Sequence, residues 1–146
     1  MFRNQGIEFK GDRFVGVKGG KKPYEQLLDY VEQYFEQNSR THTTTYPIME
    51  KPSRITMTAQ PPLYLQRPHH SMTIVGIELR RDGSRNLLVF DPAYNPLQQV
   101  AKGAIADLNS KHPHRLLRPY RRGRWHLRRY HAFETLTLRS IDPTSS

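Results

Sequence analysis

The spacing of apolar residues predicts a helix over residues 23–37. Pro23 suits the first turn of a helix, where a backbone N–H has no partner to lose. The apolar residues recur at the three- and four-residue spacing of one helical face. They are Tyr24, Leu27, Leu28, Val31, Tyr34 and Phe35. Charged and amide side chains fall on the other faces, so we expect this stripe to pack into the core rather than form a binding groove.

Residues 61–96 contain three runs that predict antiparallel strands. The runs are Leu63–Gln66, Ser71–Leu79 and Asn86–Phe90, and Val, Ile, Leu and Phe dominate the two longer ones. Asp-Gly between two apolar runs is a strong hairpin signal, and Asp82-Gly83 stands there. A two-residue loop at this point would place Asp91 opposite Ile74.

Weaker patterns complete the predicted fold. Apolar and polar residues alternate, as in half-buried strands, over Arg54–Ala59 and Tyr130–Leu138. Short strands are expected at Gly6–Lys10 and Arg13–Val17. A second stripe of apolar residues at helical spacing predicts a helix over Leu97–Asn109. The predicted fold class is α+β, an antiparallel sheet of about four to six strands with two flanking helices. We expect a poorly defined N-terminal segment over residues 1–22, the folded part over 23–139 and a polar tail over 140–146.

The composition narrows the class of protein. The chain has 146 residues, a net charge of +10 and no Cys. The length suits one domain. The absence of Cys excludes a disulfide framework, a zinc finger with thiolate ligands and thiol catalysis by these residues alone. No apolar run approaches a membrane span and the N-terminus lacks the apolar core of a signal peptide, so we expect no membrane partner and a location in the cytoplasm, the nucleus or both.

Two side chains suited to acid–base chemistry stand at the open end of the predicted hairpin. His70 precedes its first long strand and Asp91 follows its second. His70 is four residues from Ile74, so the predicted register puts His70 and Asp91 on one face of the sheet. A register shift by an even number of residues keeps this parity and leaves both side chains on that face. They are a candidate general base and its orienting carboxylate. The alternative is that Asp91 only caps the turn that follows its strand.

A longer motif surrounds these two residues. The pattern PPLYLQ-x3-HS-x-T-x-VGIE, followed by a strand that ends in Asp-Pro, resembles the papain-like cysteine peptidases specific for ubiquitin-fold modifier or ubiquitin. That family includes the ubiquitin-fold-modifier-specific proteases and a zinc-finger ubiquitin peptidase. The resemblance is dense over residues 61–92 and weaker over 24–59 and 130–138. The family often has Gly just before the His, where this chain has His69.

The resemblance implies a site and a partner. His70 and Asp91 would complete a Cys–His–Asp triad, Gln66 would contribute to the oxyanion hole, and the partner would be ubiquitin or ubiquitin-fold modifier, with no cofactor. The family's Cys begins a helix in the preceding lobe, and it has no counterpart here. We therefore expect the C-terminal part of a papain-like peptidase domain, from a truncated gene model or a degenerate pseudo-protease, that is inactive alone. Without the lobe, an apolar face would be bare and stability marginal.

A basic tract supports an alternative function. Lys111–Arg129 carries eight Lys or Arg and no acidic residue. Five of its arginines stand near Tyr120 and Trp125, a mixture suited to phosphates and bases. They are Arg121, Arg122, Arg124, Arg128 and Arg129. The alternative is a non-catalytic module that binds nucleic acid or an acidic protein through this tract. A simpler interpretation is a solvated hairpin tip with Trp125 folded back over the sheet. The histidines lack a metal-ligand spacing, so we predict no metal.

Overall fold

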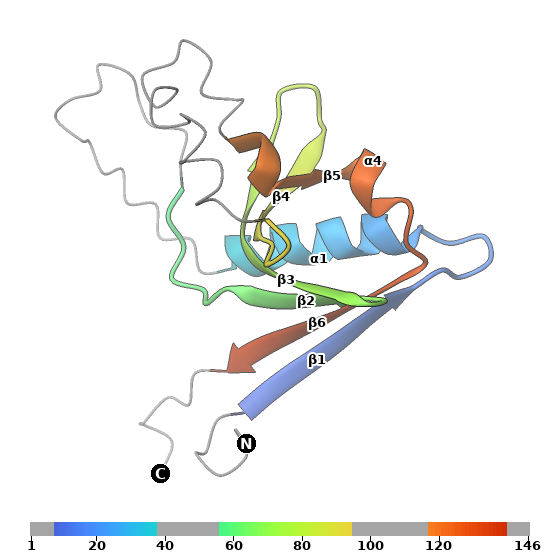
Figure 1. The fold of residues 1–146 in the computed structure, drawn as a ribbon, viewed down its shortest axis with the longest axis horizontal. Coiled ribbons are helices and arrows are strands. Elements are labelled where there is room, and N and C mark those ends of the chain that lie inside the picture. The colour runs from blue at the N-terminus through green and yellow to red at the C-terminus, as the bar shows by residue number, and fades with distance from the viewer. Residues whose placement is uncertain (1–7, 38–55, 95–116, 140–146) are drawn as a thin grey trace, which may run out of the picture.

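The computed structural model describes residues 8–37, 56–94 and 117–139. Six strands form one sheet in the order β1-β6-β2-β3-β4-β5 (Figure 1), and every neighbouring pair is antiparallel. The strands are β1 (Glu8–Val15), β2 (Leu63–Arg67), β3 (His70–Leu79), β4 (Arg85–Phe90), β5 (Arg121–Gly123) and β6 (Ala132–Arg139), and the helices are α1 (Pro23–Glu36), the 3₁₀ helix η4 (Arg118–Tyr120) and α4 (Arg124–Leu127). The α+β class and the antiparallel sheet are confirmed for this part of the chain, whereas the short helix α4 was not predicted.

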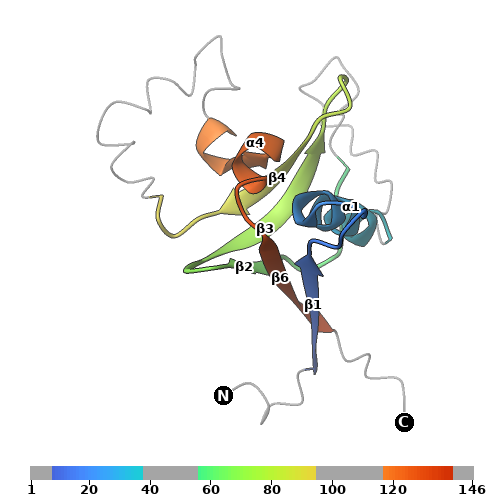
Figure 2. The same cartoon turned by 90° about the vertical axis from the view of Figure 1, so that its right-hand side faces the viewer.

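Helix α1 supplies one side of the core. It lies along one face of the twisted sheet, against β1, β3 and β6 (Figures 1 and 2). Leu27 and Val31 are fully buried against the sheet, and each such side chain contributes about 1.5–3 kcal/mol. The Glu25 carboxylate accepts the backbone N–H of Lys22 at 2.9 Å, which satisfies an otherwise unpaired donor at the helix start. The predicted helix is confirmed to within one residue of its end.

The turn between β3 and β4 differs from the predicted two-residue loop. Arg80 N–H donates to the carbonyl of Ser84 at 2.9 Å, and Gly83 N–H donates to the carbonyl of Arg80 at 3.0 Å. Gly83 has a φ of 79°, in the left-handed region that favours glycine. These features are those of a three-residue loop that ends in a left-handed residue. The predicted register was therefore wrong by one position next to the turn.

A β-bulge in β3 moves the register by a further position. Ile77 pairs with Leu87, whereas beyond the irregularity between Ile74 and Gly76, Ile74 pairs with Val89. The prediction had placed Asp91 opposite Ile74. Because the turn and the bulge each shift the register by one residue, their sum keeps the parity, and Asp91 remains on the face expected for it.

Three further predictions are corrected by the structure. The two short N-terminal strands are one strand, β1, because its pairing with β6 continues through Gly11. Residues 56–59, the described part of the predicted strand Arg54–Ala59, form no strand. The edge strand β5 was not predicted, because three polar residues carry no alternation of apolar and polar positions. Predicted helix 97–109 and residues 111–116 lie outside the described residues. Neither α1 nor α4 is long and apolar enough to span a membrane.

Candidate active site

His70 is positioned by a tight turn between β2 and β3. Arg67 pairs with His70, so only Pro68 and His69 lie between the two strands. His69 has a φ of 63°. A proline followed by a residue with positive φ is typical of a type II turn, in which glycine is favoured at the second position. The conformation therefore explains why a glycine suits the place of His69.

The structure brings His70 and Asp91 together. His70 Nε2 lies 2.8 Å from Asp91 Oδ1, and their side chains are 19% and 9% exposed. His70 begins β3 on the same face as the buried Met72 and Ile74, and Asp91 follows β4 on the face of the buried Val89. Two adjacent strands thus place an imidazole and a carboxylate at one end of the sheet, as their shared parity predicted.

Asp91 has two more partners. Its Oδ1 also accepts the backbone N–H of Ala93 at 2.9 Å, so Asp91 does cap its turn, as the alternative interpretation held. Its Oδ2 accepts a hydrogen bond from Arg122 Nη2 at 2.8 Å. Burial raises the pKa of Asp91, but the bonds from Arg122, Ala93 and His70 outweigh it and lower the pKa below its usual value. Asp91 is therefore held as a carboxylate at neutral pH.

Arg122 is a site residue that the sequence analysis placed on a different surface. It lies in β5 opposite the fully buried Leu87, so its side chain shares the inner face of the sheet, and it is only 12% exposed. Its Nη1 donates to the carbonyls of Pro119 and Arg121. In an extended strand, successive side chains point to opposite faces, so Arg122 would have been expected on the other face from Arg121 and Gly123. This strand was not predicted from the sequence.

His126 lies among cationic groups near the same site. Burial and the charges of Arg122, Arg67 and Arg129 lower the pKa of His126, which favours its neutral form. Its Nε2 is buried without a hydrogen-bond partner in the part of the chain that the structure describes. Within that part, no three His, Asp or Glu side chains gather in a way that could hold a metal ion.

Gln66 does not join the His70–Asp91 pair. It pairs with Ser71 in the β2–β3 hairpin, one position away from the Arg67–His70 pair, so its side chain emerges on the opposite face from His70. There it lines a shallow pocket of about 250 Å³ with Tyr64 and Glu134. Its role in an oxyanion hole stays a prediction.

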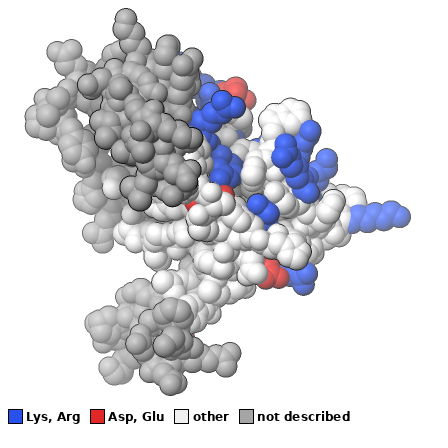
Figure 3. Space-filling model, in the orientation of Figure 1, with Lys and Arg blue, Asp and Glu red and all other residues white. Residues whose placement is uncertain are grey.

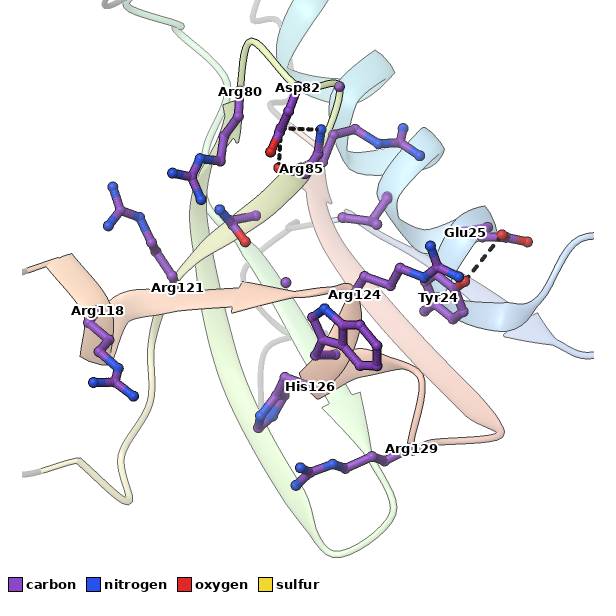
Figure 4. Close-up of a pocket in the computed structure, with 16 residues that line it drawn as sticks. Tyr24, Glu25, Arg80, Asp82, Arg85, Arg118, Arg121, Arg124, His126 and Arg129 are labelled. Carbon is purple, nitrogen blue, oxygen red and sulfur yellow. Dashed lines mark hydrogen bonds between the residues drawn. The ribbon is translucent and has the colours of Figure 1, made fainter. Parts of the chain in front are cut away.

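The remaining residues of the basic tract separate into different surroundings. Arg121 forms an ion pair with Glu78 at 2.6 Å. The guanidinium of Arg128 lies 3.8 Å from the centre of the Trp125 ring. The side chain of Trp125 is 69% exposed, so the interpretation that it folds back over the sheet was wrong. Arg124 and Arg129 line a surface groove at α4 (Figure 4).

Comparisons with known proteins place this chain in a family. The chain is 49% identical over 87 residues to zinc finger-containing ubiquitin peptidase 1 of Mus musculus, and this match covers 60% of the chain and 13% of the mouse protein. It is 31% identical over 92 residues to the Rattus norvegicus protein of the same name, covering 63% of the chain and 14% of that protein. The matches thus span a small part of these relatives. The model of peptidase family C78 matches residues 1–136, and the chain therefore belongs to this family.

Proposed function

We propose that His70 and Asp91 are the general base and the orienting carboxylate of a papain-like, ubiquitin-directed thiol peptidase site. The hydrogen bond of 2.8 Å between His70 Nε2 and Asp91 Oδ1 carries this proposal. The Asp91 carboxylate can only accept a hydrogen bond, so His70 Nε2 carries the proton. The neutral imidazole then keeps its lone pair on Nδ1. Nδ1 has no hydrogen-bond partner among the described residues, and it is the atom that would take a proton.

The chemistry assigns each side chain one task. His70 Nδ1 would accept the proton of a Cys thiol, and the thiolate would attack the carbonyl carbon of the modifier's last residue to form a thioester. His70 would then give that proton to the leaving amine as the C–N bond breaks. Asp91 would hold the imidazole in the required tautomer and stabilise its cation. Arg122 would keep the Asp91 carboxylate charged and oriented.

The thiol must come from elsewhere, since these 146 residues contain no Cys. We therefore propose that the chain by itself binds its substrate class without cleaving it. The names of the mouse and rat relatives point to ubiquitin as the modifier, with ubiquitin-fold modifier as the second candidate. A site that cleaves after a modifier must hold the C-terminal residues of that modifier.

Titration of isotope-labelled ubiquitin and ubiquitin-fold modifier with the 146-residue chain, followed by NMR, tests this function. We expect saturable shifts at the C-terminal residues of one modifier, and binding that weakens at least tenfold when those residues are removed. His70→Ala should leave the dissociation constant within twofold, because the base serves chemistry rather than binding. The chain should release no fluorophore from a modifier conjugate. Absence of shifts with both modifiers at high micromolar concentration would overturn the proposal.

A further inference from the structure

A basic groove lies beside α4, apart from the His70–Asp91 pair. Its volume is about 960 Å³, and six arginines from separate parts of the chain line it (Figure 4). They are Arg80, Arg85, Arg118, Arg121, Arg124 and Arg129. Lys and Arg side chains gather over this part of the surface in Figure 3. Neither His70 nor Asp91 lines the groove, so a ligand bound there does not have to contact these two residues.

Two of the six arginines are neutralised by carboxylates. Arg85 contacts Asp29 and Glu32, each at 2.8 Å. Arg121 pairs with Glu78. The other four form no ion pair within the described residues, and all four are exposed. The groove therefore keeps the charge of Arg80, Arg118, Arg124 and Arg129.

The acidic residues of the groove offset only part of this charge. Among the described residues, Glu25 and Asp82 are the acidic ones that line it, and their two negative charges face four arginines that have no ion-pair partner. Glu25 accepts the backbone N–H of Lys22, and Asp82 accepts the backbone N–H of Ser84. Four unpaired guanidinium groups around one hollow repel one another and favour an anionic ligand with several charges.

Trp125 adds an aromatic surface to the charged groove. It is the single Trp of the chain, it lines the groove and it is 69% exposed. The guanidinium of Arg128 lies over its ring at 3.8 Å, which restrains the indole. Exposed aromatic rings beside arginines are the elements with which proteins stack bases and follow the phosphates of single strands.

We propose that this groove binds single-stranded nucleic acid. Arg80, Arg118, Arg124 and Arg129 contact successive phosphates, and a base stacks on Trp125. Arginine is suited to phosphate because its planar fork donates two parallel hydrogen bonds. An acidic peptide would use the same charges, but it offers no base to stack on the face of the Trp125 ring that Arg128 does not cover, so nucleic acid accounts for more of the groove.

The fluorescence of Trp125 gives a local test, because no other Trp contributes to the signal. The full chain is titrated with a twelve-nucleotide oligo(dT), and binding is also followed by the anisotropy of a labelled strand. We expect saturable quenching. Four phosphate contacts predict a slope of about −3 for the logarithm of affinity against that of salt concentration.

Two sets of substitutions separate this site from general attraction. Arg80→Ala with Arg118→Ala and Arg124→Ala should weaken binding more than tenfold and reduce the salt slope to about −1. Trp125→Leu should weaken binding at least fivefold and leave the salt slope unchanged. The matched control is Lys10→Ala with Arg13→Ala and Lys18→Ala, which removes three exposed cations at and after β1 and should change affinity less than threefold.

Two results would overturn the proposal. One is equal weakening by the arginine and control triples, because binding would then follow net charge alone. The other is a polyglutamate peptide of matched charge that quenches Trp125 and binds as tightly as the oligonucleotide, because the groove would then serve acidic proteins. Circular dichroism of every variant establishes that it is folded.

Discussion

At the scale of single residues, the carboxylate of Asp91 links three separate segments. Its two oxygens accept hydrogen bonds from His70 in β3, Ala93 in the following turn and Arg122 in β5. Arg122 and Asp91 are 12% and 9% exposed, so neither charge is well solvated without the other. The orientation of the proposed base therefore depends on an arginine that is distant in sequence.

Removal of Arg122 tests this dependence through its effect on stability at different pH values. Arg122→Ala should lower the free energy of unfolding by about 3 kcal/mol at pH 7, because it leaves a buried carboxylate short of a partner. The folded-state pKa of Asp91 is lowered, so its ion pair stabilises the protein above the unfolded pKa of about 3.9 and this contribution is lost as pH falls through the folded pKa. The difference in free energy of unfolding between variant and parent, measured by urea unfolding, should therefore become smaller below about pH 4.

The control is Arg128→Ala, which removes an exposed guanidinium that lies over the Trp125 ring. We expect its free energy of unfolding to fall by less than about 1 kcal/mol, and by the same amount at pH 7 and at acidic pH. A constant difference for Arg122→Ala down to pH 3 would show that the Asp91 charge is not what Arg122 stabilises.

At the scale of elements, two hairpin turns and one bulge decide which face each site residue occupies. The three-residue turn before β4 and the irregularity between Ile74 and Gly76 each shift the register once. Either change alone would turn Asp91 to the outer face, away from His70. The turn at Pro68 and His69 sets where β3 begins, so its conformation also fixes the position of His70.

His69→Gly should stabilise the β2–β3 turn. His69 has a φ of 63°, where a side chain is strained and glycine is not. Relief of this strain outweighs the added flexibility of the unfolded chain, so we expect a gain of about 0.5–1 kcal/mol in urea unfolding. His131→Gly is the matched control, because His131 is exposed and is not among the described residues with positive φ. His131→Gly should lower the free energy of unfolding by about 0.5 kcal/mol. If both substitutions changed the free energy of unfolding in the same direction, strain at His69 would not be the cause.

At the scale of the whole molecule, the two faces of the sheet are unequally covered. One face packs against α1 and holds the buried Leu63, Leu65 and Phe133. On the other face, Tyr64 pairs with Leu136, and Tyr64, Leu136 and Leu138 are 44%, 39% and 47% exposed. The described helices do not pack on this apolar surface, and a bare face left by a missing lobe stays a prediction.

This surface should bind an apolar fluorescent dye in native buffer. Leu136→Thr with Leu138→Thr should lower the dye fluorescence at least twofold, because Thr keeps strand propensity while it removes apolar area. The matched control is Leu79→Thr with Leu117→Thr, two leucines with exposures of 54% and 46% that lie elsewhere. An equal decrease for both pairs would show that the dye reports scattered leucines and not this face.

The sequence by itself determined the elements whose signals are local. The stripe of α1, the apolar runs of β2, β3 and β4, and the alternation of β6 each follow from the spacing of residues within one segment. The same spacing placed His70 and Asp91 on one face, because parity survives a register error of two positions. The motif around His70 also predicted the family that the comparisons confirm.

Tertiary structure alone decided what depends on pairing between distant segments. β5 exists because β4 offers it a free edge, and that pairing turns Arg122 inward to Asp91 while Arg121 turns to Glu78. The groove likewise joins arginines of the β3–β4 hairpin, η4 and α4, whose separation along the chain gives no sign that they meet. Local spacing carries no information about such partners, since their positions depend on how the strands pair and the sheet twists.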